Sequence, residues 1–505
     1  MLAAIRSAAI IGIEAYEVVV EVDAASGLPA WTLVGLPLGA VKESRERVGA
    51  AIVNSGFTLP PRRITVNLAP ADVRKDGTAF DLPIALGILV ATGQVDGECI
   101  GDRIYAGELG LDGQIRPVRG ALSMARYAAA AGVRELVIPP ANVAEAARVS
   151  TLTLGAPASL RDLVSELSDG GLSAARAQRT QATAREEILD FADVVGQDTA
   201  KRALEVAAAG GHNLLMIGPP GAGKTMLARR LPGILPELTE EESLEVIAIH
   251  SVAGLLTSES VLSSARPFRA PHHSISSAGL IGGGSSPRPG EVSLAHNGVL
   301  FLDEMYEFPR FVLDGLRQPM EDGRVSISRV AGSVRFPARF TLVGATNPCP
   351  CGRLGDPTGS CTCSATEVDR YGGRVSGPLA DRIDMHVTVG AVSLHDLSSS
   401  VREESSAAIR ERVRAARSLQ VSRYCHLQNV SCNAHASGRA IDVSGFVAPD
   451  ARSLLQTASS SLQLSARGYH RVLKVARTIA DLDECAVVGF THVSEALRYR
   501  PPAGK

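Results

Sequence analysis

The sequence predicts a multidomain α/β protein whose last part is entirely helical. At 505 residues the chain is too long for a single hydrophobic core, and about three domains of ~150 residues each are expected. Short β-branched runs alternate with stretches of helical spacing up to about residue 392, whereas only helical spacing follows. We therefore predict a leading α/β domain over 1–167, a linker over 168–188, an α/β core over 189–392 and a helical lid over 393–505.

The composition restricts the partners and the compartment. The chain carries 51 basic and 53 acidic residues, a net charge of −2, so no overall field attracts nucleic acid and any such binding is local. No stretch approaches the ~20 apolar residues that a membrane span requires, and the N-terminal residues lead directly into strand-like sequence. We expect a cytoplasmic protein without membrane contacts. The eight cysteines are too few for a disulfide framework in so long a chain.

The leading domain mixes both kinds of element. Residues 18–22, 63–68 and 135–138 are short, β-branched runs bounded by glycine, proline or polar residues, which is typical of strands. Residues 38–54 and 121–131 carry helical spacing. The domain is therefore predicted to be mixed α/β.

Part of this domain resembles the proteolytic domain of Lon. The resemblance lies in Lys75-Asp-Gly77, in an apolar helix expected over 82–90, and in the stretch 107–139. Lon depends on a serine–lysine pair, whereas this chain carries Ala79 at the serine position and Leu122 at the lysine position. Neither side chain can act as a nucleophile or a base.

The neighbouring hydroxyl groups do not restore the pair. Thr78 and Ser123 would fit only after a shift of one residue, and neither would then have a lysine as its partner. We expect a Lon-like fold without peptidase activity, which serves as a scaffold or a docking module.

The predicted linker separates this domain from the core. Residues 168–183 are rich in glycine, serine, alanine, glutamine and arginine and have no apolar period, which indicates a flexible connection. Residues 190–197 then open a new domain, and a helix is expected over 199–209. The opening segment resembles the part of AAA+ ATPases that faces the nucleotide base.

A P-loop defines the core. An apolar run over 214–217 precedes a glycine-rich loop, and helix-favouring residues follow it over 226–231. The loop consists of Gly218, Pro219, Pro220, Gly221, Ala222, Gly223, Lys224 and Thr225. Its backbone N–H groups can surround phosphate oxygens, Lys224 can reach the β- and γ-phosphates, and the Thr225 hydroxyl can bind Mg²⁺. The sequence therefore predicts that a nucleoside triphosphate binds here with Mg²⁺.

Two further strands are expected to end beside this loop. The apolar run 298–302 leads into Asp303 and Glu304. Asp303 can hold Mg²⁺ through its water shell, and Glu304 can polarise the attacking water. The run 340–346 leads into Asn347, which is placed like the first sensor residue of AAA+ ATPases. Without the other motifs, Asn347 would be interpreted as a strand-end cap before a proline.

Two arginines are assigned by resemblance. Residues 376–384 are similar to the segment that carries the arginine finger in the Mg-chelatase and replicative-helicase branch of AAA+ proteins, and Arg382 matches the finger. It would act in trans on the γ-phosphate of a neighbouring subunit. The alternative is a local salt bridge with the flanking aspartates, worth ~0–1 kcal/mol. Residues 465–480 resemble the second-sensor helix, in which Arg467 would lean over the nucleotide and Arg471 is the second choice.

Two insertions interrupt the core. Residues 265–297 are polar and too long for a simple connection, and loops of that length are usually functional. Residues 323–336 alternate with period two around Ala-Gly-Ser, which predicts a hairpin. In the AAA+ branch just named, both insertions project into the channel of a hexameric ring and touch DNA. Arg329 near the hairpin tip is the first candidate for a phosphate contact, with Arg324 and Arg335 behind it. The alternative is a solvated hairpin edge that charge protects from pairing.

Four cysteines form a second kind of site. Cys349 and Cys351 make one C-x-C pair and Cys361 and Cys363 another, on either side of a short loop. Together they can supply four thiolates to a zinc ion, although C-x-C is tighter than the usual spacing of structural zinc sites. A cluster of reduced thiols is the alternative. The neighbouring histidines of the first insertion are not assigned as ligands.

The last part of the chain is predicted to be an all-helical lid. Apolar residues recur at intervals of three and four over 451–460, 468–481 and 493–500, and residues 402–423 form a charged helix.

Taken in order, these motifs resemble the bacterial Mg-chelatase-like AAA+ ATPases, the family of the competence helicase ComM. The resemblance spans essentially the whole chain. It implies a hexameric, ATP- and Mg²⁺-dependent DNA helicase or translocase that promotes branch migration of recombination intermediates, as in natural transformation, with DNA and recombination proteins as partners. Two alternatives are the motor subunit of a magnesium or cobalt chelatase and a nucleotide-regulated scaffold. The Lon-like domain argues against the first, and the complete set of nucleotide-site residues argues against the second.

Overall fold

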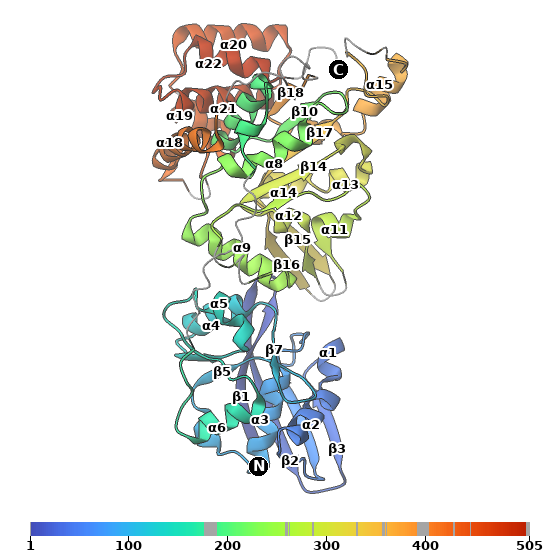
Figure 1. Cartoon of the computed structure of the whole chain (residues 1–505), viewed down its shortest axis with the longest axis vertical. Helices are drawn as coiled ribbons and strands as arrows, with labels where there is room; N and C mark the ends of the chain where they lie inside the picture. The colour runs from blue at the N-terminus through green and yellow to red at the C-terminus, as the bar shows by residue number, and fades with distance from the viewer. Residues whose placement is uncertain are drawn as a thin grey trace.

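The computed structural model describes residues 2–175, 189–257, 261, 263–284, 287–329, 332–355, 359, 361–390, 403–427, 430–444 and 446–500. The molecule is elongated, and its three parts follow one another along the long axis (Figure 1). The leading domain lies at one end, the C-terminal helices lie at the other, and the core sheet lies between them. Among the described residues, no helix is both long and apolar enough to cross a membrane.

The leading domain contains two main sheets. Its strands are β1 (Leu2–Ile11), β2 (Glu14–Ala25), β3 (Ala30–Val34), β4 (Arg63–Ala69), β5 (Arg103–Tyr105), β6 (Glu108–Leu109), β7 (Ile115–Arg116), β8 (Glu135–Val137) and β9 (Thr153–Gly155). Its helices are α1 (Gly39–Lys42), α2 (Ser44–Asn54), α3 (Asp81–Ala91), α4 (Ala121–Ala130), α5 (Val143–Ala146) and α6 (Leu160–Ser168). The first sheet has the order β1-β2-β4-β3, and the second has the order β5-β8-β9 with all strands parallel.

Helix α3 forms the centre of this domain. All of its residues are buried, and it packs on β1 and β2. Strand β2 alternates, so Val18, Val20 and Val22 lie on one buried face. The continuous apolar stretch of α3 is explained by this burial on every side.

The leading domain continues beyond residue 167, where the linker was predicted to begin. Ala174 forms a β-bridge with Gly155, and the N–H of Ala175 donates to the carbonyl of Leu154 at 2.7 Å. Leu172 packs against the core of the domain. These backbone pairs extend the second sheet, which the polar composition of the segment does not reveal. The rest of the predicted linker, 176–188, lies outside the described residues.

The core contains a parallel sheet of five strands in the order β11-β14-β17-β10-β18. These strands are β10 (Leu214–Ile217), β11 (Phe268–Arg269), β14 (Gly298–Leu302), β17 (Phe340–Thr346) and β18 (Met385–Thr388). The helices of the core are α7 (Asp198–Gly210), α8 (Lys224–Ile234), α9 (Glu240–Ala253), α11 (Ser277–Ile281), α12 (Glu291–Leu294), α13 (Arg310–Asp314), α14 (Arg317–Asp322), α15 (Ala365–Gly372) and α16 (Gly377–Ala380). Because the strands are parallel, the residues that follow β10, β14 and β17 meet at one edge of the sheet.

Two small hairpins belong to the insertions. They are β12 (Gly282–Gly283) with β13 (Arg288–Pro289), and β15 (Arg324–Arg329) with β16 (Gly332–Pro337). In the second hairpin Val325, Ile327 and Phe336 are buried against the core. That side of the hairpin is therefore fixed to the sheet layer.

The C-terminal part is helical throughout its described residues. It comprises α18 (Ser406–Tyr424), α19 (Gly438–Ser444), α20 (Pro449–Ser461), α21 (Ala466–Leu482) and α22 (Phe490–Arg498). Helices α18 and α21 pack on α7 and share its hydrophobic core.

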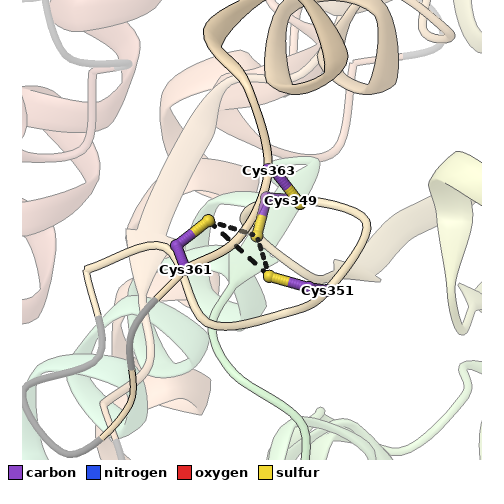
Figure 2. Close-up of side chains that lie close together, drawn as sticks. All are labelled: Cys349, Cys351, Cys361 and Cys363. Carbon is purple, nitrogen blue, oxygen red and sulfur yellow. Dashed lines mark hydrogen bonds between the residues drawn. The ribbon is translucent and has the colours of Figure 1, made fainter.

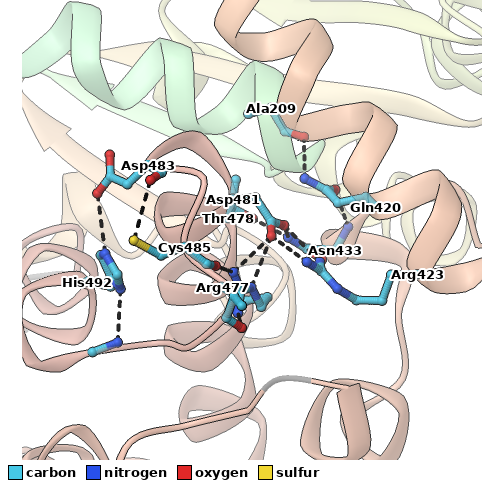
Figure 3. A network of polar contacts seen from close by, with 12 residues as sticks. Ala209, Gln420, Arg423, Asn433, Arg477, Thr478, Asp481, Asp483, Cys485 and His492 are labelled. Carbon is cyan, nitrogen blue, oxygen red and sulfur yellow. Dashed lines mark hydrogen bonds and ion pairs between the residues drawn. The ribbon is translucent and has the colours of Figure 1, made fainter.

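A buried polar network fixes α21 to α18 (Figure 3). The Asp481 carboxylate accepts hydrogen bonds from Arg423 Nη1 at 2.8 Å, Asn433 Nδ2 at 2.9 Å and Arg477 Nε at 3.1 Å. Asp481 and Arg477 are almost completely buried, so each needs these partners to offset the loss of water. The network therefore fixes one register between the two helices.

The leading domain is docked on the core through α9. Leu122, the residue at the Lon lysine position, is buried against Ile247 and Ala248 of that helix. The Ser251 hydroxyl of α9 donates to Glu145 at 2.5 Å and accepts a hydrogen bond from the Gly120 N–H at 2.9 Å. The contact therefore combines apolar packing with buried polar groups that have hydrogen-bond partners.

Candidate functional site

The P-loop is built at the end of β10. Gly221 and Gly223 have φ values of +79° and +85°, a conformation that other residues rarely adopt. They allow the chain to turn from β10 into α8, which begins at Lys224. The Lys224 ammonium donates to the carbonyls of Gly218 at 2.7 Å and Pro219 at 2.9 Å. Burial lowers its pKa, while the charges of Asp303 and Glu304 oppose this shift.

Asn347 lies beside the P-loop lysine. Lys224 Nζ donates to Asn347 Oδ1 at 3.2 Å. This contact joins the ends of β10 and β17, which are neighbours in the sheet. The asparagine is therefore in position to share a phosphate group with the lysine.

Thr225 and Asp303 form a pair of oxygen donors. The Thr225 hydroxyl donates to Asp303 Oδ2 at 2.7 Å. A hydroxyl and a carboxylate beside a phosphate-binding loop are the ligands that Mg²⁺ prefers, directly or through its waters. These two residues fit a magnesium ion, and they would hold it next to the phosphates.

Glu304 follows Asp303 in a left-handed turn. Its φ is +49°, and its N–H donates to Asp303 Oδ1 at 3.0 Å. A non-glycine residue in this conformation costs roughly 1–2 kcal/mol, and such strain is often found at functional sites. The side chain is 58% exposed, so water can reach the carboxylate.

The structure places a histidine beside Glu304 that the sequence does not identify. His273 Nδ1 lies 3.5 Å from Glu304 Oε2. The only signal for it in the sequence is its position, a few residues after the segment Phe268–Arg269 of the first insertion. That segment becomes β11, which pairs with β14 and so directs the following loop towards Glu304.

A cavity of about 750 Å³ lies next to the P-loop strand. It is bordered by Asp198 and Thr199 of α7, by Ile217 at the end of β10, and by Phe490 and Arg498 of α22. The segment 190–197, which resembles the base-facing part of AAA+ proteins, leads directly into it. None of the described residues that line it belongs to the P-loop itself, residues 218–225.

Arg382 and Arg467 lie together in a different place. Both line a groove of about 800 Å³, and none of the described residues that line it belongs to the P-loop. Arg382 forms an ion pair with Glu321 and donates to the carbonyl of Pro378. Its flanking aspartates have other partners, because Asp381 pairs with Arg471 at 3.2 Å and Asp384 accepts from the Asn213 N–H at 3.0 Å.

Comparisons with known proteins identify the family. Residues 190–397 match the family described as magnesium chelatase, subunit ChlI, residues 20–142 match subunit ChlI of Mg-chelatase, and residues 403–500 match the C-terminal part of subunit ChlI. Competence protein ComM of Haemophilus influenzae is 44% identical over 507 residues, which cover 99% of this chain and 97% of ComM. The chain belongs to the Mg-chelatase-type AAA+ ATPase family, of the ComM and YifB type.

Two further relatives of this AAA+ chain are informative. The YifB protein of Escherichia coli is 43% identical over 505 residues, which cover 99% of this chain and 97% of YifB. Lon protease 2 of Bacillus subtilis is 29% identical over 185 residues, which cover 32% of this chain and 33% of that protein. A similarity to Lon is therefore also found by alignment, over about a third of this chain.

In this Mg-chelatase-type chain the residues at and beside the positions of the Lon serine–lysine pair make packing contacts and hydrogen bonds. Leu122 is buried in the docking contact with α9. The two nearby hydroxyls have other roles, because Thr78 donates to Glu108 at 2.5 Å and Ser123 donates to the carbonyl of Ile13 at 2.6 Å. None of these contacts involves a lysine. Ala79 is partly buried and packs in the leading domain.

In this AAA+ chain the structure describes the side chains of two of the three predicted hairpin arginines. Arg324 and Arg335 lie at the surface of the hairpin, and the register Ser326–Arg335 and Arg324–Pro337 places them on one face of it. Arg329 pairs through its backbone with Gly332, and its side chain lies outside the described part of the chain.

The four cysteines of the two C-x-C pairs come together in space (Figure 2). Cys349 Sγ lies 3.4 Å from Cys351 Sγ and 3.7 Å from Cys361 Sγ, and the last two are 3.6 Å apart. All four sulfur atoms, including that of Cys363, lie within 4.8 Å of one another. Hydrogen bonds from the backbone N–H groups of Arg353 and Thr362 lower the pKa of Cys351 to about 5.

Proposed function

We propose that this protein is an ATP-driven motor of an oligomeric ring that moves DNA, including branched recombination intermediates. The proposal rests on one observation. The charged groups expected to act on the nucleotide lie in two separate places on the chain. Lys224 contacts Asn347 and Thr225 contacts Asp303 on the P-loop side, whereas Arg382 and Arg467 line a groove elsewhere. A site that is complete only with a second subunit is typical of a ring ATPase.

ATP and Mg²⁺ are the proposed ligands of the P-loop side. Lys224 and the loop N–H groups bind the β- and γ-phosphates, and Thr225 and Asp303 hold the magnesium ion, which neutralises charge on the phosphates. Glu304 accepts a proton from the attacking water, and Asn347 orients that water. The cavity beside Ile217 receives the base.

The groove is proposed to receive the nucleotide of the neighbouring subunit. The Nη groups of Arg382 bind Glu321 and the carbonyl of Pro378, and they would exchange these contacts for phosphate oxygens of the neighbour's nucleotide. Arg471 holds the chain segment next to it through Asp381 and the carbonyl of Ile383. Arg382 would stabilise charge on the transferred phosphoryl group, and Arg467 would contact the same nucleotide.

DNA is proposed to bind to the hairpin. Arg324 and Arg335 offer two cations on one face, while the other face packs on the core. Phosphate contacts of this kind need no sequence information, which suits a translocating motor. The similarity to a competence protein over 99% of the chain supports a role in processing incoming DNA. The same similarity also favours DNA, rather than another chelatase subunit, as the partner of this chain.

The test is an ATPase assay with DNA of defined structure. We expect Mg²⁺-dependent hydrolysis that a fork or a four-way junction stimulates, and displacement of a labelled strand from the junction. Hydrolysis without any response to DNA would contradict the DNA role. Absence of hydrolysis in assembled protein would favour the nucleotide-regulated scaffold.

A further inference from the structure

Three of the four cysteine sulfurs are spaced like corners of a metal tetrahedron, and the fourth, of Cys363, lies within 4.8 Å of them. A Zn–S bond of about 2.3 Å implies edges of about 3.8 Å between the thiolates of a tetrahedral site. The distances of 3.4, 3.6 and 3.7 Å between Cys349, Cys351 and Cys361 are close to this value. They are far from the ~2.05 Å of a disulfide.

The local backbone explains how a C-x-C pair can direct both thiols to one point. Gly352 follows the first pair with φ at +78°, and its N–H donates to the carbonyl of Cys349 at 3.0 Å. This turn places Cys349 and Cys351 on the same side of the loop. The second pair approaches from the segment before α15 (Figure 2).

We propose that Cys349, Cys351, Cys361 and Cys363 bind one structural Zn²⁺ ion. Four thiolates in a closed set are a common ligand set for structural zinc, and they leave no coordination position open for catalysis. The ion replaces the thiol protons and links the two C-x-C pairs.

The zinc site also supports the nucleotide site. Cys349 follows Asn347 by two residues, and Asn347 contacts Lys224. The same turn touches the P-loop, since a side-chain carbon at Gly352 would come within 2.6 Å of Pro220. The metal-bound turn therefore fixes the position of Asn347, and the cysteines are positioning residues for hydrolysis. This role rests on the proposed ATPase function, whereas metal binding does not.

Metal content is the first test. Full-length protein purified under reducing conditions should contain one zinc per chain by mass spectrometry of the metal. Replacing zinc by Co²⁺ should produce the visible bands of tetrahedral cobalt and a thiolate charge-transfer band. Protein that binds neither zinc nor Co²⁺ when reduced would overturn the proposal, with no need for a variant.

Variants separate the site from other cysteines. Cys361→Ser with Cys363→Ser should remove the zinc, whereas Cys425→Ser with Cys485→Ser, at exposed cysteines elsewhere, should retain it. Zinc kept by the first variant and lost by the second would overturn the assignment. If the first variant does not fold, release of zinc from wild-type protein by a mercurial reagent shows that thiolates hold the ion.

The positioning role has a separate readout. In the zinc-free variant we expect ATP to bind with little change in affinity while turnover falls by ~10–100-fold, the range found for residues that orient a site. An equal loss of binding and turnover would indicate general unfolding of the core and contradict a positioning role. If wild-type protein binds zinc but the zinc-free variant hydrolyses ATP at the same rate, the metal site exists and does not position Asn347.

Discussion

His273 Nδ1 lies 3.5 Å from the Oε2 atom of Glu304. The same imidazole lies tilted against His272, with ring centroids 4.0 Å apart, and forms an edge contact with Phe308. Both histidines belong to the first insertion, which we expect to face the channel of the ring. This insertion thus reaches the carboxylate that we assign to the attacking water.

Replacing His273 should release Glu304. His273→Ala is expected to raise the rate of ATP hydrolysis without DNA, because the carboxylate is free to turn towards the water, and to reduce further stimulation by DNA. Steady-state ATPase rates with and without a DNA junction measure both effects. His426→Ala, at an exposed histidine just after α18, is the control. Equal rates in both variants and wild type would show that the contact does not regulate hydrolysis.

Glu304→Gln should separate binding from hydrolysis. The variant keeps Thr225 and Asp303, so it should bind ATP with Mg²⁺, but loss of the proton acceptor should slow turnover by ~10²–10⁴-fold. Fluorescent-nucleotide binding and single-turnover hydrolysis measure the two steps. Lys224→Ala is the comparison and should bind poorly. Normal turnover in Glu304→Gln would assign the water to another residue.

Mixed rings test whether Arg382 acts on a neighbour. Arg382→Ala should bind nucleotide and decrease turnover by ~10³-fold or more. An equal mixture of Arg382→Ala and Lys224→Ala subunits should recover activity, because some junctions then pair an intact P-loop with an intact arginine. Light scattering checks assembly. If assembled mixtures stay inactive, Arg382 serves its own subunit or its ion pair with Glu321.

The hairpin arginines should change the salt dependence of DNA binding. Arg324→Ala with Arg335→Ala is expected to weaken binding to all sequences alike and to flatten the dependence on salt by about one unit of slope for each phosphate that is no longer neutralised. Basal hydrolysis should not change. Arg329→Ala, tested separately, would show whether the hairpin tip also binds phosphate. An unaltered salt dependence in all of these variants would move the DNA contact to the first insertion.

Docking of the leading domain should depend on pH. Burial raises the pKa of the Glu145 carboxyl, although Ser251 and Asn142 donate hydrogen bonds to it. The docked state thus favours the protonated acid, so the stabilisation from this group is complete below the ordinary pKa of glutamate. It is lost as the pH rises through the raised value.

Ser251→Ala should make this dependence steeper. It removes a hydrogen bond to a buried acid, a destabilisation of ~1.5–3 kcal/mol when the acid is charged. Amide exchange in α4 and α9 should therefore increase more above neutrality than at mildly acidic pH. Ser418→Ala, at an exposed serine of α18, controls for the pH dependence of exchange itself. The same increase at every pH would exclude Glu145 as its source.

The sequence predicts the P-loop side well because that side depends on local patterns. Strands β10, β14 and β17 are short apolar runs, and their parallel pairing brings Thr225, Asp303 and Asn347 to one edge of the sheet. Contacts between distant segments are different. The approach of His273 depends on β11, a strand of two residues, and the burial of Leu122 depends on a helix from another domain. Neither leaves a periodic pattern in the sequence.

The resemblance to a family also does not determine how the site residues are arranged in space. It names Arg467 as a residue that leans over the nucleotide, but not the subunit that provides the nucleotide. The groove that Arg467 shares with Arg382 is what indicates a neighbour. The close approach of the cysteine sulfurs likewise depends on the turn at Gly352, which the C-x-C pattern alone does not predict.

The turn between β1 and β2 determines how the protein can be divided for experiments. A side-chain carbon at Gly12 would lie 3.0 Å from Val334 of the hairpin, and Ile13 packs against both the hairpin layer and α9. A motor fragment cut free of the first 175 residues would leave Ile247, Ala248 and Val334 in water. Such a fragment would tend to self-associate through these newly exposed apolar side chains. Its hydrolysis rate and its particle size would then describe an artefact of truncation, so deletion of the leading domain cannot serve as a measure of what that domain contributes.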